Sequence, residues 1–317
     1  MLTLGDLLSD VADRTSEKLL HEPKVELKDG SFDPAKLPID AATWHFLSDV
    51  VAVVFDMRGS TQLENGRSAA STASIYDAGV GSVARVLREF DADFVDIQGD
   101  GGFGLFWGER RYERAMCAAI TIRSYSDEFT AQIERKWKSA PSTGFKVAVA
   151  SSSIMAKRVG IPRHLDLQEP VWAGHAVNYA AKAAQQTDPR NLVITASVWD
   201  EIRSNDYLSF SCGCDGSGNQ TGLSVLWKDV ELDKIPDEER FGQSVSSPWC
   251  SVHGDEFCDA ILKGNRHRPD IAEGLRSERN LRGSYSSTLV TLARRRGENR
   301  RQFANDSSIT AARGGER

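Results

Sequence analysis

The chain has 317 residues, of which 40% are hydrophobic and 26% charged, a composition typical of a folded globular protein. Its formal net charge of −6 gives no electrostatic basis for tight binding to nucleic acid or to an anionic membrane, so we expect neither as a partner. We find no apolar run long enough to span a bilayer and no signal peptide. With five cysteines, an odd number, these features predict a cytoplasmic protein with free thiols or a metal site.

Residues 1–46 are predicted to form an N-terminal arm. A short amphipathic segment there contains four apolar residues, namely Leu4, Leu7, Leu8 and Val11, and a stretch with proline and aspartate follows it. Such an arm could pack on a partner subunit.

The next elements form a strand, a helix and a hairpin. The β-branched run Val50–Phe55 suits a strand buried on both faces. Apolar residues recur at helical spacing over Ser71–Phe90. Two short strands, Phe94–Gln98 and Phe103–Trp107, flank the sequence Gly99-Asp100-Gly101-Gly102, which is typical of a hairpin turn.

The remaining elements of the core alternate in the same way. We expect a helix at Tyr112–Lys136, a strand at Phe145–Ala150 and a loop around Val159-Gly160. A helix at Ala176–Gln186, a strand at Asn191–Thr195 and a short helix at Ala196–Ser204 should follow. The order βαββαβ predicts an α+β, ferredoxin-like domain over residues 47–205.

The pattern changes after this domain. Residues 206–281 are predicted to form a small C-terminal extension with a glycine-rich stretch, a strand at Leu223–Val230 and a helix that ends near Leu262. Residues 282–317 are polar and rich in arginine, so we expect them to form a flexible tail.

Two aspartates stand at special places: Asp56 at the exit of the first strand, and Asp100 in the hairpin turn. If the strands are neighbours, the two carboxylates lie close together, which is unfavourable unless a cation sits between them. Hard divalent ions such as Mg²⁺ or Mn²⁺ prefer oxygen ligands, and a two-metal site can activate a hydroxyl for attack on a phosphate. The alternative is that each aspartate only caps a turn.

Four sequence blocks occur in order: VVFDMRGST, VDIQGDGGFGLFWG, KVAVASSSIMAKRVG and WAGHAVNYAAKAA. Together, over Val50–Arg203, they resemble the catalytic domain of class III adenylate and guanylate cyclases. The resemblance implies a ferredoxin-like core, two divalent metal ions, Mg²⁺ or Mn²⁺, and a homodimer whose active sites combine residues of both subunits. It also implies a nucleoside triphosphate as the substrate.

The same resemblance implies roles for particular residues. Asp56, Asp100 and the backbone carbonyl of Met57 would be the metal ligands. The loop that follows, with Arg58, Gly59, Ser60 and Thr61, would hold phosphates. Asn178 matches the asparagine that orients the ribose, and Lys182 stands where the family has its transition-state arginine. Lysine lacks the planar donor fork of arginine, so this position departs from the family pattern.

The base pocket departs from the adenylate cyclase pattern. Asp96 stands where those enzymes have a lysine, and Tyr76 and Trp172 would narrow the pocket in favour of a pyrimidine, unless they only pack in the core. The segments WAGHAVNYAAK and WCSVHGDEFC also resemble pyrimidine cyclases of the Pycsar antiphage defence system. This resemblance implies conversion of UTP to cyclic UMP, which a separate effector would read. The alternatives are a cytidylate or adenylate cyclase, or a catalytically inactive nucleotide-binding regulator.

The extension contains five residues that could bind zinc, namely Cys212, Cys214, Cys250, His253 and Cys258. Their spacing matches no standard zinc motif, so unligated thiols are the alternative.

Overall fold

The computed structural model describes residues 3–38, 42–65, 67–138, 142–161, 164–215, 219 and 221–280. The chain forms two compact units: a smaller one from Met1–Ser48 and Ser153–Ala173, and a larger one from Asp49–Ser152 and Gly174–Arg317. The predicted tail, residues 282–317, lies outside the described residues, and the domain boundaries drawn from the sequence stay predictions.

The smaller unit begins with a helix that is longer than the sequence pattern predicts. Helix α1 spans Leu4–Leu20, and Thr3 and Asp6 cap its first turn reciprocally. None of its residues is buried. The other elements of this unit are β1 (Val25–Lys28), η1 (Pro34–Lys36), the first part of β2 (Trp44–Met57), the last part of β5 (Phe145–Gly160), η2 (Leu165–Leu167) and β6 (Gln168–Gly174).

The larger unit contains the sheet that carries Asp56 and the turn with Asp100. Its strands follow the order β3-β4-β2-β5-β7-β9-β8, and the first four have the order of a ferredoxin-like sheet, which confirms the predicted α+β core. The elements are α2 (Ser60–Leu63), α3 (Ala69–Glu89), β3 (Phe94–Gln98), β4 (Gly101–Phe106), α4 (Arg111–Lys136), α5 (Ala176–Ala184), β7 (Leu192–Ile194), α6 (Ala196–Ile202), α7 (Asp206–Ser209), β8 (Lys228–Glu231), η3 (Asp237–Arg240), β9 (Phe241–Val245) and α8 (Gly254–Leu262).

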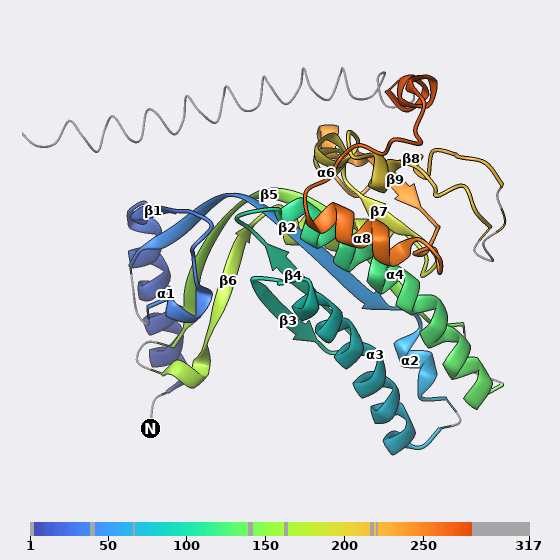
Figure 1. Ribbon diagram of the computed structural model, residues 1–317. Helices are drawn as coiled ribbons and strands as arrows, with labels where there is room; N and C mark the ends of the chain where they lie inside the picture. The colour runs from blue at the N-terminus through green and yellow to red at the C-terminus, as the bar shows by residue number, and fades with distance from the viewer. Residues whose placement is uncertain are drawn as a thin grey trace, which may run out of the picture. The chain divides into compact units, whose positions relative to one another are not determined.

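The core of this unit forms between the sheet and its helices. Residues 50–55 of β2 are all buried, as expected for a central strand covered on both faces. Helix α3 buries Ile75, Val83 and Leu87 and contacts β3 and α4, and Figure 1 shows it alongside the β3–β4 hairpin. Strand β2 and the hairpin are therefore held on a packed layer of helices.

Strand β5 is longer than predicted. It continues past Ala150 to Gly160, so the predicted loop around Val159-Gly160 was wrong. Ile154 and Ala156 are buried while their neighbours are partly exposed, which is the alternation of a strand with one covered face. This half of the strand pairs with β6, which the sequence pattern did not predict.

The C-terminal extension continues the main sheet. Strand β9, also not predicted, pairs antiparallel with β7 and with β8. The predicted strand at Leu223–Val230 is found at Lys228–Glu231, and the predicted helix near Leu262 is α8. The extension therefore shares backbone hydrogen bonds with the core.

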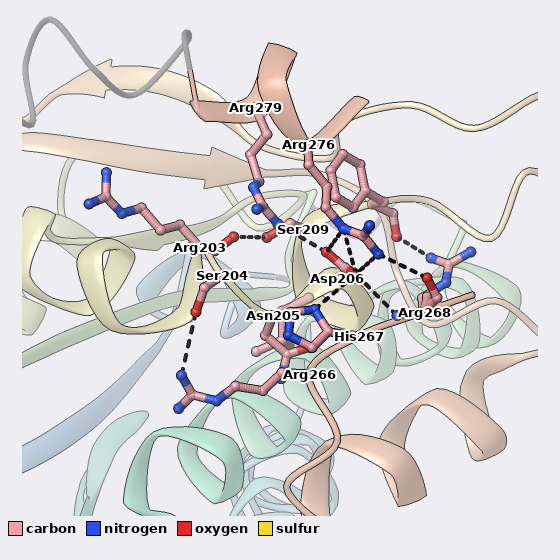
Figure 2. Close-up of polar contacts among 12 residues, drawn as sticks. Arg203, Ser204, Asn205, Asp206, Ser209, Arg266, His267, Arg268, Arg276 and Arg279 are labelled. Atoms are coloured by element: carbon pink, nitrogen blue, oxygen red, sulfur yellow. Dashed lines mark hydrogen bonds and ion pairs between the residues drawn. The ribbon is translucent and has the colours of Figure 1, made fainter. Parts of the chain in front are cut away.

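A buried carboxylate holds the last described segment. Asp206 is fully buried at the start of α7, and accepts hydrogen bonds from Arg276 Nη2 (2.8 Å), Arg279 Nη1 (3.1 Å) and the backbone N–H of Arg268 (3.1 Å) (Figure 2). Burial raises the pKa of Asp206, but the hydrogen bonds and charges of the arginines outweigh it and leave the pKa below its ordinary value. Residues 266–280 are thereby anchored on α7.

No helix in the described ranges is long and apolar enough to cross a membrane. The cytoplasmic location stays a prediction.

Candidate active site

The structure brings Asp56 and Asp100 together. Asp56 follows the buried run 50–55 of β2 and pairs in register with Gly101 of β4, directly beside the turn that carries Asp100. The backbone N–H of Met57 donates to the carbonyl of Asp100 at 3.2 Å, so the strand end and the turn are joined. Both aspartate side chains are half-buried.

Gly101 makes this close approach possible. A Cβ atom at this position would stand 2.7 Å from the carbonyl oxygen of Phe55 and 3.5 Å from Oδ1 of Asp56. The first distance is shorter than a carbon–oxygen contact allows, so a side chain here would push the hairpin away from β2. The glycine that the sequence places after Asp100 therefore allows the hairpin to lie close to the end of β2.

The pair has the electrostatics expected of a cation site. Burial raises the pKa of the Asp56 carboxyl, and the negative charge of Asp100 raises it further. Lys146, on the neighbouring strand β5, opposes this rise. A divalent cation between the carboxylates would remove the repulsion.

Sequence reasoning missed Lys146. The signal was present, because Lys146 is the single charged residue in the run Phe145–Ala150, which is otherwise apolar. A half-buried lysine in a central strand indicates a nearby carboxylate.

The loop after Met57 is fixed through its backbone. The N–H of Arg58 donates to the carbonyl of Gly144 at 2.9 Å, and its carbonyl accepts from Thr143 Oγ1 at 2.9 Å. Gly59 follows with φ +70°, in the left-handed region that glycine adopts without strain, and begins α2. The side chains of Arg58 and Thr61 are exposed, whereas Ser60 is buried.

Asn178 and Lys182 lie on a different element, helix α5. The side of α5 that packs on the unit consists of small residues, namely Ala176, Ala180, Ala183 and Ala184. Asn178 and Lys182 are one turn apart and both exposed, so they share the outer face. The amide of Asn178 donates to the carbonyl of Gly174 at 3.2 Å, which fixes the direction of its side chain.

The three candidates for base recognition lie on three different elements. Tyr76 is half-buried on α3, and Asp96 is half-buried on β3, where it accepts a hydrogen bond from Gln98 Nε2 at 2.8 Å. Trp172 lies on β6, in the smaller unit, where its ring meets that of Phe32 edge to face at 6.4 Å. Their roles stay predictions.

Four of the five zinc candidates form one cluster. The ligand atoms of Cys212, Cys214, Cys250 and His253 all lie within 4.8 Å of one another. Cys258 lies elsewhere: its carbonyl is 3.9 Å from the sulfur of the buried Cys117.

Comparison with known proteins identifies relatives of this chain. No family model matches it. It is 47% identical over 271 residues to a uridylate cyclase of Micromonospora echinofusca, covering 84% of this chain and 87% of the relative. It is 46% identical to a uridylate cyclase of Propioniciclava tarda, covering 87% of this chain and 89% of the relative.

Solved structures agree on the fold. An adenylyl cyclase from P. aeruginosa superposes with a TM-score of 0.51 at 12% identity, covering 64% of this chain and 96% of its own. A class III adenylyl cyclase-like ATP-binding protein from Pseudomonas aeruginosa gives 0.52 at 17% identity, covering 85% and 50%. The resemblance seen in the four sequence blocks is confirmed: the chain belongs to the family of these uridylate cyclases and is a nucleotidyl cyclase with the class III fold.

Proposed function

We propose that this cyclase converts UTP into 3′,5′-cyclic UMP and pyrophosphate at a site built around Asp56 and Asp100. The observation that carries the proposal is the pairing of these carboxylates at the end of a central strand, in a chain whose relatives are named uridylate cyclases. The reaction is an in-line displacement, in which the ribose 3′-oxygen attacks the α-phosphorus and pyrophosphate leaves.

The residues present fit divalent cations. Two half-buried carboxylates that repel each other offer hard oxygen ligands, and the carbonyl of Met57 would be a further ligand. Bound there, two ions such as Mg²⁺ or Mn²⁺ would acidify the 3′-hydroxyl and neutralise charge on the triphosphate.

The protein's own groups would bind and orient the nucleotide. The loop Arg58–Thr61, whose backbone is tied to residues 143–144, would hold the phosphates. The side chain of Asn178 would orient the ribose, and the ammonium of Lys182 would stabilise negative charge that develops at the α-phosphate.

We propose that Asn178 and Lys182 act on the nucleotide held by the partner subunit of a homodimer. Both side chains point outward from α5, which supports a role at an interface between copies. Mixing the Asp56→Asn and Asn178→Ala variants tests this, because a mixed dimer regains one intact composite site. Random exchange would restore about a quarter of wild-type activity if the dimer has two composite sites. Sites contained in single subunits would give no recovery.

We propose that Asp96, Tyr76 and Trp172 take part in base recognition. A carboxylate at position 96 would accept a hydrogen bond from the N3–H of uracil, a donor that cytosine lacks. The bulk of the Tyr76 ring and that of the Trp172 ring would each favour a one-ring base. We expect Asp96→Asn to reduce the ratio of kcat/KM for UTP to that for CTP, because an amide can both donate and accept.

The test of the substrate is a panel of ATP, GTP, CTP and UTP, each incubated separately with the protein and Mn²⁺, with products identified by mass spectrometry. Cyclic UMP as the main product supports the proposal. Cyclic CMP or cyclic AMP would favour the cytidylate or adenylate cyclase alternatives. Nucleotide binding without product from any of the four would favour an inactive regulator.

We further propose that cyclic UMP serves as a second messenger of antiphage defence, read by a separate effector, as the resemblance to Pycsar cyclases implies. Phage plating on cells of the source bacterium with the wild-type gene and on cells with the Asp56→Asn variant tests this role. Protection that survives the variant would contradict it.

A further inference from the structure

We propose that Cys212, Cys214, Cys250 and His253 bind one structural Zn²⁺ ion in the C-terminal extension. The cluster joins two segments that are distant in sequence, since Cys214 and Cys250 are 36 positions apart. The proposal is independent of the substrate and of the metal ions at Asp56 and Asp100.

The distances between the ligand atoms fit a tetrahedral site. Nδ1 of His253 lies 3.6 Å from Sγ of Cys214 and 3.7 Å from Sγ of Cys250. The sulfurs of Cys212 and Cys214 are 3.0 Å apart, and those of Cys214 and Cys250 are 3.1 Å apart. With Zn–S bonds of about 2.3 Å, two sulfurs of a tetrahedral site lie about 3.8 Å apart, so the sulfurs of each pair need to separate by a further distance of about 0.7–0.8 Å.

The donor set is that of a closed zinc site. Three thiols and one imidazole supply four protein ligands and leave no position for substrate, which is the arrangement of structural zinc. The described structure contains no disulfide among Cys117, Cys212, Cys214, Cys250 and Cys258, so none competes for the sulfurs of the cluster. Zinc requires thiolates as ligands, so binding of the ion would release the thiol protons.

The surroundings of the cluster show what a zinc ion would stabilise. His253 stands immediately before α8, which packs on α4. The backbone N–H of Trp249 donates to Ser124 Oγ (2.8 Å) and its indole N–H to Thr121 Oγ1 (2.9 Å), both on α4. The loop with Cys212 and Cys214 leaves the core just after α7. One ion would therefore link the loop with Cys212 and Cys214 to the segment with Cys250 and His253, which packs on α4.

An apolar cavity borders the cluster. It has a volume of about 340 Å³ and is lined by three of the cysteines together with aromatic residues, among them Phe210, Trp227, Trp249 and Phe257. An apolar wall beside a metal site limits access of water and chelators to the ligands. We therefore expect the ion to be retained during dialysis.

The chain offers its own control. Cys258 is only five positions after His253, but its contact is with Cys117 and it is not part of the cluster. Cys258→Ser removes a thiol from α8 and leaves the four ligand atoms in place, whereas Cys250→Ser removes a ligand.

The test is the metal content of the full-length protein, purified with a reductant, loaded with Zn²⁺ and dialysed. Elemental analysis is expected to give about one zinc per chain for the wild type, for Cys258→Ser and for Asp56→Asn, and at least a tenfold lower content for Cys250→Ser. Wild-type protein with less than about a tenth of an equivalent would overturn the proposal. An equal loss in Cys258→Ser, or a loss in Asp56→Asn, would also overturn it.

A spectroscopic measurement on the wild type covers the case in which Cys250→Ser does not fold. Titration of the metal-free protein with Co²⁺ should produce the intense absorption of a tetrahedral cobalt–thiolate site, and Zn²⁺ should abolish it. Absence of the thiolate-to-cobalt band would overturn the assignment of these ligands.

Discussion

The buried carboxylate of Asp206 gives a quantitative prediction about the stability of the chain. Substitution by asparagine keeps the shape of the side chain but removes the negative charge that faces Arg276 and Arg279. Asp206 has no exposed surface, so water cannot replace the lost partner. Breaking a buried ion pair from one side costs about 3–5 kcal/mol.

This loss of unfolding free energy can be converted into a decrease in melting temperature. With an unfolding entropy of about 2.1 cal/mol/K per residue, a chain of 317 residues should melt about 4–8 °C lower. In urea, the midpoint should fall while the m-value stays unchanged, because the folded surface is the same.

Glu128→Gln is the matched control. Glu128 also pairs with an arginine, Arg135, at 2.9 Å, but more than half of each of these two side chains is exposed. Exposed pairs contribute about 0–1 kcal/mol, so this variant should unfold close to the wild type. An equal loss in both variants, or a loss below about 1 kcal/mol for Asp206→Asn, would refute the reasoning from burial.

The pH dependence follows from the sign of the shift. The pKa of Asp206 is lower in the folded chain than in the unfolded chain. Its contribution is therefore present in full at neutral pH, above the unfolded pKa, and is lost as the pH falls through the folded pKa. The difference in unfolding free energy between wild type and Asp206→Asn should shrink in acid, and a constant difference would contradict the account.

Three further predictions concern the site. Asp56→Asn should stabilise the metal-free protein at pH 7, because the pKa of Asp56 is raised and its ionisation therefore costs folding free energy. Urea unfolding in the presence of a chelator should show a higher free energy of unfolding for the variant, and this gain should disappear as the pH falls below the raised pKa. An unchanged free energy of unfolding would count against repulsion between Asp56 and Asp100. Lys146→Met removes the charge that lowers the pKa of Asp56, so the acid limb of the pH–rate profile should move to higher pH, and an unmoved limb would exclude this coupling. Gly101→Ala should cost about 1–3 kcal/mol in thermal unfolding and reduce kcat, because its Cβ would stand 2.7 Å from the carbonyl of Phe55; full activity would show that the carboxylate spacing is not critical.

Local sequence signals predicted the centre of the fold well. The β-branched run Val50–Phe55 has a strong intrinsic preference for strand and was found in β2. The hairpin turn was also found, but it consists of Gly99 and Asp100 alone, because Gly101 and Gly102 already pair in β4. The predicted helices at Ser71–Phe90 and Tyr112–Lys136 differ from α3 and α4 by at most two residues at either end.

Features that depend on distant partners could not be predicted in this way. The second half of β5 is a strand because β6 pairs with it, and residues 241–245 form β9 because they pair with β7. The same limit applies to the cysteines. Sequence spacing alone cannot show that Cys258 contacts Cys117 through its carbonyl and lies outside the cluster. It also cannot show that the sulfur of Cys250 lies beside that of Cys214, because the fold brings these two residues together.

The most direct test of the central claim is a competition assay. Wild-type protein and the Asp100→Asn variant are each given an equimolar mixture of ATP, GTP, CTP and UTP with Mn²⁺, and cyclic products are quantified by mass spectrometry. We expect cyclic UMP to dominate for the wild type, and Asp100→Asn to reduce it at least about a hundredfold, since metal ligation supplies several kcal/mol of transition-state stabilisation. A different dominant product from the wild type, or undiminished cyclic UMP from Asp100→Asn, would contradict the account.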